Sequence, residues 1–422
     1  MSAMACLNHR LINNYHDGLI SAVIQTDLSA AFDTVDHEIL LSKLEHYGID
    51  GKTNNLLKSF LSDRYQYVSI DGIQSEVVQS LPCSVIQGSK LSALLYTLYI
   101  NEVTILQKLM GSDLYGRITR ETVPIKSEII DHDIIQYVDD TNNIVAGKSA
   151  EEVQNYSNRY FKLIQNFYTI NKLKLNPDKT HLMVVCRPSK RQEVQNLILN
   201  AGDFIIEQVD KIKVLGVFFT SGLNNHANIS NIISKINHRM YTMREAFGFS
   251  SKKSKTIFLK AMVISVIRYC SPILIDCEVK VLDKLQTRLM KCTRPILGFS
   301  SFKLSTLQIM AELKIQTVHQ MIIRDSILFI HKVLVNKKPG VIFNLFSQSN
   351  SQNNRDVKKY RVQFVHKSSK VTNSLFYRSL YLFNCLPTDI RNSNVKKMSK
   401  YLQENLNYIF PYNKIPKAKE SN

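Results

Sequence analysis

The 422-residue sequence lacks the patterns that mark membrane, secreted and zinc-binding proteins. It contains no run of about 18 apolar residues, so we expect no membrane-spanning helix. Met1–Arg10 has no basic stretch followed by an apolar core, so we expect no secretory signal there. The seven cysteines form no C-x-x-C pair, which argues against a zinc site or a disulfide framework. Reduced thiols in the cytosol or nucleus are the simplest explanation.

The charge of the chain is distributed unevenly. Residues 1–200 contain 19 Lys or Arg and 22 Asp or Glu, a net formal charge of −3. Residues 201–422 contain 35 and 13, a net charge of +22. A strongly basic half usually meets a polyanion, most often nucleic acid. The alternative is a basic surface that only aids solubility.

Two adjacent aspartates, Asp139 and Asp140, lie between two apolar runs, Ile134–Ile135 and Ile144–Ala146. This pattern predicts a strand, a tight turn and a second strand. Carboxylates placed side by side repel each other, and a divalent cation would remove that repulsion. The alternative is a solvated turn, because Asp is common in turns.

The first half of the chain mixes expected strands and helices. We expect a helix over 1–18, a strand over Ser21–Thr26 that ends at Asp27, helices over 37–47 and 52–61, a hairpin of 65–70 and 73–79 around Asp71–Gly72, and an apolar helix over 90–106. A polar insertion follows over 109–133, and a later helix opens with a capping box from Ser149 to Glu152. A turn is expected at Asn176–Lys179. Strands are expected at His181–Val185 and at Ile212–Phe219, and Gly216 interrupts the second of these.

The second half is expected to be mostly helical. The candidate helices cover 228–247, 254–270, 278–296, 303–314 and 317–335. A domain boundary is expected near 225, a flexible link over 346–370 and a frayed tail over 411–422. The sequence has no internal repeat.

The expected strands make a specific chemistry testable. If the strand before Asp27 and the strands flanking Asp139–Asp140 are neighbours in one antiparallel sheet, three carboxylates converge at one rim. Hard oxygen donors of this kind suit magnesium. Two such ions about 4 Å apart stabilise the attacking and leaving oxygens of an in-line phosphoryl transfer.

An ordered series of motifs runs along the chain at Asp27–His37, Gln87–Ser89, Leu94–Glu102, Tyr137–Asp140, Leu175–Thr180 and Val214–Val217, followed downstream by Tyr269–Pro272, Leu282–Gln286 and Ile296–Gly298. This series resembles that of reverse transcriptases, and most closely the non-LTR (LINE-type) retrotransposon group. Each motif alone is weak, but their order and spacing together are specific.

The resemblance implies an α+β fold, a right-hand polymerase palm with an antiparallel sheet followed by a mostly helical thumb. It implies a remnant of the fingers or palm at 1–20, the palm at 21–225, a basic helical thumb at 226–345 and a basic C-terminal region at 346–422. The implied activity is RNA-directed DNA synthesis with two Mg²⁺ ions, Mn²⁺ being the alternative metal. The implied partners are an RNA template, a DNA primer, their RNA–DNA duplex and deoxynucleoside triphosphates, and no membrane.

The resemblance also assigns roles to single residues. Asp27, Asp139 and Asp140 match the residues that carry the metals and catalysis. Phe32 matches the residue whose ring lies beneath the incoming sugar and excludes a 2′-hydroxyl. The alternative for Phe32 is an ordinary core phenylalanine.

Further matches concern the substrates. Gln87 and Gly88 match residues that lie over the nascent base pair and template, and Lys179 matches a lysine near the triphosphate that can act as an acid towards pyrophosphate. Leu215 and Gly216 match the hairpin that grips the primer end. The alternatives are a helix-entry loop for the first pair and a solvated turn lysine for Lys179.

The sequence departs from the family pattern in several ways. The fingers that precede Asp27 in the family, and an endonuclease domain, are expected to be missing, which would make the chain a fragment or one that takes fingers in trans. Ile86 stands where Pro is usual, Val138 where Ala is frequent, and the insertion at 109–133 is longer than expected. Two alternatives to a polymerase therefore stay open: a catalytically inactive, retroelement-derived nucleic-acid-binding protein, and an intron-maturase-like RNA-binding factor.

Overall fold

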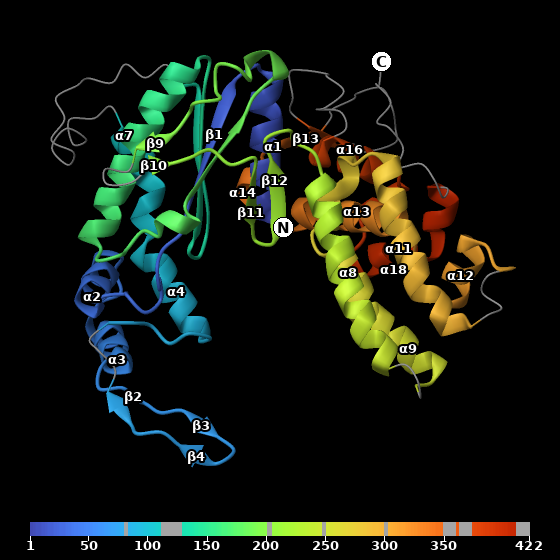
Figure 1. Cartoon of the computed structure of the whole chain (residues 1–422), viewed down its shortest axis with the longest axis horizontal. Helices are drawn as coiled ribbons and strands as arrows, with labels where there is room; N and C mark the ends of the chain where they lie inside the picture. Colours follow the sequence, from blue (N-terminus) through green and yellow to red (C-terminus); the bar gives the residue numbers. More distant parts are fainter. Residues whose placement is uncertain are drawn as a thin grey trace. The chain divides into compact units, whose positions relative to one another are not determined.

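The computed structural model describes residues 1–79, 83–110, 129–200, 205–246, 250–298, 303–348, 360–362 and 374–410. The chain forms two compact units, one of Gly18–Ile212 and one of Met1–Asp17 together with Lys213–Asn422. The α+β fold class predicted from the sequence is confirmed (Figure 1). Most of the expected insertion and link, and the whole tail, lie outside the described residues. No helix in the described part of the chain is long and apolar enough to cross a membrane.

The unit Gly18–Ile212 is built around a four-stranded antiparallel sheet with the strand order β6-β7-β1-β8. Its strands are β1 (Ile20–Thr26), β6 (Asp131–Tyr137), β7 (Asp140–Gly147) and β8 (His181–Val185). Every residue of β1 is buried, and Ile20, Ala22 and Ile24 pack in one apolar cluster with Phe161. Phe161 lies on α7 (Ala150–Ile170), which the predicted capping box of Ser149 and Glu152 begins.

Further helices of this unit come before and after the hairpin of residues 65–79 in the chain. It consists of α2 (His37–His46), α3 (Gly51–Leu61), α4 (Lys90–Tyr99), a 3₁₀ turn (Asn101–Ile105) and α5 (Leu106–Leu109). The single helix expected over 90–106 therefore ends early. Lys43 Nζ donates to the carbonyl oxygen of Tyr99 at 2.5 Å, which satisfies one of the carbonyl groups left over at the helix end.

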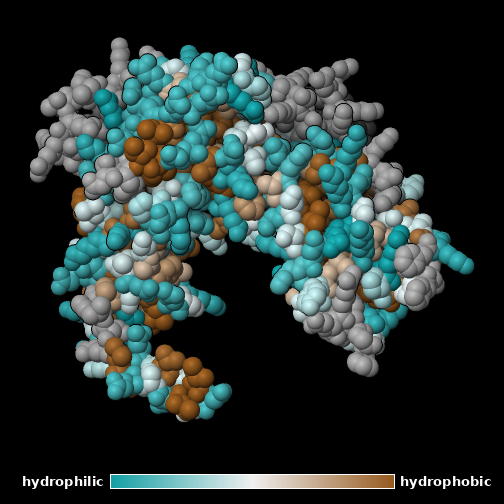
Figure 2. Space-filling model, viewed as in Figure 1, coloured by the Kyte–Doolittle hydropathy of each residue, from teal (hydrophilic) through white to brown (hydrophobic). Residues whose placement is uncertain are grey.

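The predicted turn at Asp71–Gly72 is confirmed. Asp71 and Gly72 have φ of 49° and 85°, as a two-residue type I′ turn requires, and they join β3 (Ser69–Ile70) to β4 (Ile73–Gln74). The strands that flank this turn region, β2 (Tyr65–Gln66) and β5 (Val78–Gln79), pair with each other. Ile70 and Ile73 stay exposed, and Figure 2 shows hydrophobic surface at this hairpin.

The rest of the unit consists of short elements. They are the 3₁₀ turns Pro177–Lys179 and Pro188–Lys190 and the strands β9 (Leu199–Asn200) and β10 (Ile205–Ile206), which pair with each other.

The other unit is mostly helical, as predicted. Its helices are α1 (Ser2–His16), α8 (His226–Ala246), α9 (Lys252–Phe258), α10 (Ser265–Arg268), α11 (Val279–Leu297), α12 (Thr306–Glu312), α13 (Val318–Asn336), α14 (Gly340–Phe343), α16 (Leu375–Asn384), α17 (Thr388–Arg391) and α18 (Val395–Ile409). The apolar helix α13 packs against α11, α16 and α18. A π-helical segment, Leu259–Ile264, joins α9 to α10.

One element here differs from the sequence-based expectation. The strand expected over Ile212–Phe219 is a hairpin of β11 (Lys211–Val214) and β12 (Val217–Thr220), because Leu215 and Gly216 both take positive φ and reverse the chain. The N-terminal helix α1 packs on α16, where the rings of His9 and Phe376 form a T-shaped pair with centroids 5.2 Å apart. The remaining strands, β13 (Phe346–Gln348) and β14 (Tyr360–Val362), pair with each other.

Candidate active site

The strand register brings the three acidic residues together. β1 and β7 run antiparallel with Thr26 opposite Thr141, so Asp27 follows β1 at the level where Asp140 begins β7. Asp140 in turn pairs with Tyr137 across the β6–β7 hairpin, which leaves Val138 and Asp139 as its two-residue turn. The strand–turn–strand pattern and the neighbouring strands expected from the sequence are both present.

The electrostatics of this rim show mutual repulsion. Partial burial raises the pKa of Asp140 above its usual value, and the neighbouring charges of Asp139 and Asp27 raise it further. The Oδ2 atom of Asp27 is buried without a hydrogen-bond partner. A buried carboxylate oxygen without a donor is costly unless a cation compensates it. The rim therefore has the negative charge that a cation would offset.

Lys179 is held beside Asp27 at this rim. The amide of Asn176 donates to the carbonyl oxygen of Asp27 at 2.9 Å, and Leu28 forms a bridge with Leu175, so the 176–179 loop is fastened beside Asp27. Lys179 Nζ consequently lies 3.6 Å from Asp27 Oδ2. The lysine side chain is 69% exposed, so it is free to turn towards a bound anion.

The residues around the rim are suited to magnesium, although their side chains do not form a closed cage. Across the described residues, no three His, Cys, Asp or Glu side chains are already arranged to enclose one ion. Magnesium is usually held by one or two carboxylates, with water and substrate phosphates completing the octahedron. Oxygen donors and mutual repulsion thus fit this metal, and Asp27, Asp139 and Asp140 are the residues that could hold it.

Phe32 lies in the same unit and packs on α4. Its ring stacks on Tyr96 with centroids 4.8 Å apart and planes 16° from parallel. The amide of Val85 donates to the carbonyl oxygen of Phe32 at 2.9 Å, and that of Ser84 donates to Val35 at 2.8 Å. These bonds tie the loop before α4 to the loop after β1.

Gln87 and Gly88 follow on that tied loop. Gln87 Nε2 donates to both carboxylate oxygens of Asp33, at 3.0 and 3.2 Å. Gly88 has φ of 86° and is exposed, and no atom lies within 4 Å of the place where a Cβ would stand. The backbone of Gly88 is therefore open to close approach by a ligand.

Tyr96 is a residue that the sequence patterns did not single out. Its side chain is fully buried, it supports Phe32, and its hydroxyl is buried without a hydrogen-bond partner. Burial raises the pKa of Tyr96, with further contributions from the charges of Tyr168, Asp139 and Asp27. Tyr96 lies in the apolar helix expected over 90–106, and an apolar pattern alone could not show its nearness to the carboxylates.

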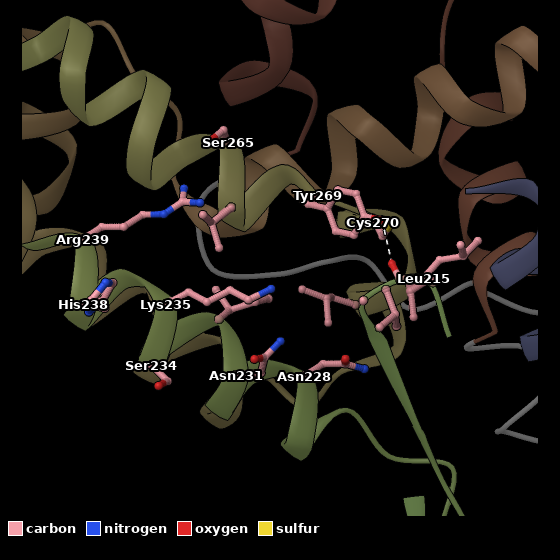
Figure 3. A pocket seen from close by; sticks show the side chains of 16 residues that line it. Leu215, Asn228, Asn231, Ser234, Lys235, His238, Arg239, Ser265, Tyr269 and Cys270 are labelled. Carbon is pink, nitrogen blue, oxygen red and sulfur yellow. Dashed lines mark hydrogen bonds between the residues drawn. The ribbon is translucent and has the colours of Figure 1, made fainter. Parts of the chain in front are cut away.

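Leu215 and Gly216 belong to the other unit, where they form the turn of the β11–β12 hairpin with φ of 47° and 82°. This turn borders a cavity of about 660 Å³ (Figure 3). Side chains of α8 line one wall, with Lys235, His238 and Arg239 among them. Tyr269 lies on the opposite side and donates its hydroxyl to the carbonyl oxygen of Leu215 at 2.7 Å.

Comparison with known proteins identifies a family for half of this chain. A family model described as reverse transcriptase (RNA-dependent DNA polymerase) matches residues 7–219. Among solved structures, the apo telomerase of Candida tropicalis is 12% identical, with 82% of this chain and 56% of that chain covered and a TM-score of 0.38. The Candida albicans telomerase in complex with a fragment of telomeric RNA is 11% identical, with coverages of 79% and 52% and a TM-score of 0.33. The chain thus spans about half the length of these telomerase chains.

Proposed function

The chain belongs to the reverse transcriptase (RNA-dependent DNA polymerase) family, whose model matches residues 7–219, and we propose on this premise that it extends a primer 3′-hydroxyl with deoxynucleotides along an RNA template. The observation that carries the proposal is the convergence of Asp27, Asp139 and Asp140 at one rim of the sheet. The motif series further supports a non-LTR (LINE-type) retrotransposon origin.

The proposed roles follow from the positions of the side chains. Asp27, Asp139 and Asp140 hold Mg²⁺, which when bound lowers the pKa of the primer hydroxyl and offsets charge on the triphosphate. Lys179, beside Asp27, supplies positive charge and a proton to the departing pyrophosphate. Phe32, supported by Tyr96, offers a flat ring to the sugar of the incoming nucleotide.

The template–primer duplex contacts exposed residues of both units. Gln87 and Gly88 contact the nascent base pair, where the glycine backbone permits close approach. The basic helices of the other unit contact duplex phosphates without reading sequence, as expected for an enzyme that must copy any template.

The direct test is primer extension on an RNA template with Mg²⁺, comparing the parent chain with Asp139→Asn. We expect the substitution to lower the extension rate by at least about 100-fold, the usual cost of removing one preorganised electrostatic group from an active site. Asp71→Asn is the matched control, because it makes the same chemical change at the exposed β3–β4 turn. Equal extension by the parent and Asp139→Asn would remove the proposed role.

The same preparation tests the second candidate function, an inactive nucleic-acid-binding protein. The observation that favours it is the basic charge of residues 201–422, a net +22. Duplex binding that weakens with salt, without nucleotide incorporation under Mg²⁺ or Mn²⁺, would support this second function over the first.

A further inference from the structure

The turn at Leu215–Gly216 has a backbone that its own sequence does not favour. Both residues take positive φ, 47° and 82°, which suits glycine but not leucine. In the left-handed region the Cβ of an L-residue crowds the carbonyl oxygen that follows. A leucine persists in such a conformation when contacts from outside the turn hold it there.

Tyr269 provides such a contact. Its hydroxyl donates to the carbonyl oxygen of Leu215 at 2.7 Å, and its ring lies 3.6 Å from the place where a Gly216 Cβ would stand (Figure 3). One residue at the turn is thus hydrogen-bonded and the next is packed. A longer side chain at 216 would meet both the ring and the unfavourable φ.

Tyr269 is itself attached to a well-anchored segment. The preceding residue, Arg268, forms a two-bond pair with Asp325 on α13, at 2.9 and 2.5 Å. Ser271, two residues further on, donates to the same carboxylate at 2.9 Å and is fully buried. The segment around Tyr269 is therefore fixed to α13. Through its contacts with Leu215 and Gly216, Tyr269 in turn restrains the turn.

The Leu215–Gly216 turn forms one edge of the cavity of about 660 Å³. The α8 wall of that cavity carries Lys235, His238 and Arg239, and none of the residues described as lining it is acidic. Apolar residues such as Ile232 and Val266 complete the lining. Cations beside apolar surface suit a sugar–phosphate strand, which presents phosphates and apolar sugar faces in alternation.

We propose that Tyr269 is a positioning residue that fixes the Leu215–Gly216 turn for contact with the terminal segment of a primer strand. This proposal rests on the proposed function, since it takes the primer as the partner. Tyr269 acts through the turn: its hydroxyl orients the Leu215 carbonyl group, and the ring limits the movement of Gly216.

The test compares Tyr269→Phe, which removes only the hydroxyl, with Tyr408→Phe, the same change at a tyrosine on α18 that is 90% exposed. Hydrogen exchange of the backbone amides in 213–218 reports the turn, and thermal unfolding reports the fold. Fluorescence anisotropy of a labelled DNA primer annealed to RNA reports affinity for the duplex. Single-nucleotide extension of the same primer separates the KM for the duplex from kcat.

For Tyr269→Phe we expect faster amide exchange in 213–218, an unchanged thermal midpoint and duplex binding weakened by about three- to ten-fold, the range of one lost hydrogen bond. The KM for the duplex should rise with kcat little changed, and Tyr408→Phe should match the parent. Exchange and affinity equal to the parent in Tyr269→Phe would overturn the proposal while leaving extension intact. A parent chain that neither binds nor extends the duplex would overturn the proposed function, and this role with it.

Discussion

The two units of the molecule treat charge in opposite ways. Gly18–Ile212 contains 19 Lys or Arg and 24 Asp or Glu, a net −5, whereas the other unit contains 35 and 11, a net +24. In the first unit, Asp27, Asp139 and Asp140 gather at one rim. In the second, carboxylates such as Asp325 and Glu312 are paired with Arg268 and Lys252.

This difference separates two physical tasks. Acidic groups that repel one another favour the binding of a cation, because the bound cation removes the repulsion. Acidic groups that are already paired leave the surrounding excess of Lys and Arg to act on an outside polyanion. This contrast supports the proposal of metal-assisted chemistry in the first unit and nucleic-acid binding by the second.

After Asp139→Asn, the largest expected effect concerns sugar selection in the acidic unit. Phe32→Val removes the ring that stacks on Tyr96 and should raise ribonucleotide incorporation relative to deoxynucleotide incorporation by about 10- to 100-fold, the range over which a pocket discriminates one hydroxyl. The ratio of the two kcat/KM values in single-nucleotide extension measures it. Phe32→Tyr keeps the ring and should keep the parent ratio. An unchanged ratio in Phe32→Val would show that Phe32 is only a packing residue.

A smaller effect is expected in the basic unit. Lys235→Gln removes one cation from the α8 wall and should weaken duplex binding about three-fold while lowering the slope of log affinity against log salt by about one. Anisotropy titrations at several salt concentrations measure both quantities. Lys400→Gln, a change at an exposed lysine on α18, is the control. If both variants lose affinity equally, the binding comes from diffuse charge and not from this wall.

The smallest effect is on stability and returns to the acidic rim. The pKa of Asp140 is raised in the folded state, so the folded chain binds this proton more tightly than the unfolded chain, and its ionised form costs stability at neutral pH. Asp140→Asn should therefore raise the thermal midpoint at pH 7 by about 1–3 °C. The gain should shrink as the pH falls through the raised pKa towards 3.8, the ordinary value of the group.

Added Mg²⁺ should reduce the difference in thermal midpoint between Asp140→Asn and the parent. Added Mg²⁺ should raise the thermal midpoint of the parent, because a ligand that binds only the folded state stabilises it, and should raise that of Asp140→Asn less. Differential scanning fluorimetry with and without Mg²⁺ measures this. Equal shifts in the two proteins would indicate that the ion binds elsewhere.

Local patterns predicted many elements of the fold. The Ser149–Glu152 capping box placed the start of α7, and Asp71–Gly72 placed a type I′ turn, because both depend on neighbours in the sequence. The strand at His181–Val185 was also predicted with the bounds that the structure shows. The prediction of one helix over 90–106 failed at Tyr99, where α4 ends and the carbonyl oxygen accepts from the distant Lys43.

The sequence by itself determined the carboxylates, the order of the motifs and the segregation of charge, since these are properties of the chain. Only the tertiary structure decided that Thr26 lies opposite Thr141, that the buried Tyr96 supports Phe32, and that Tyr269 holds the turn at Leu215. Strand register and packing depend on groups tens of residues apart, and no local preference specifies which of them meet.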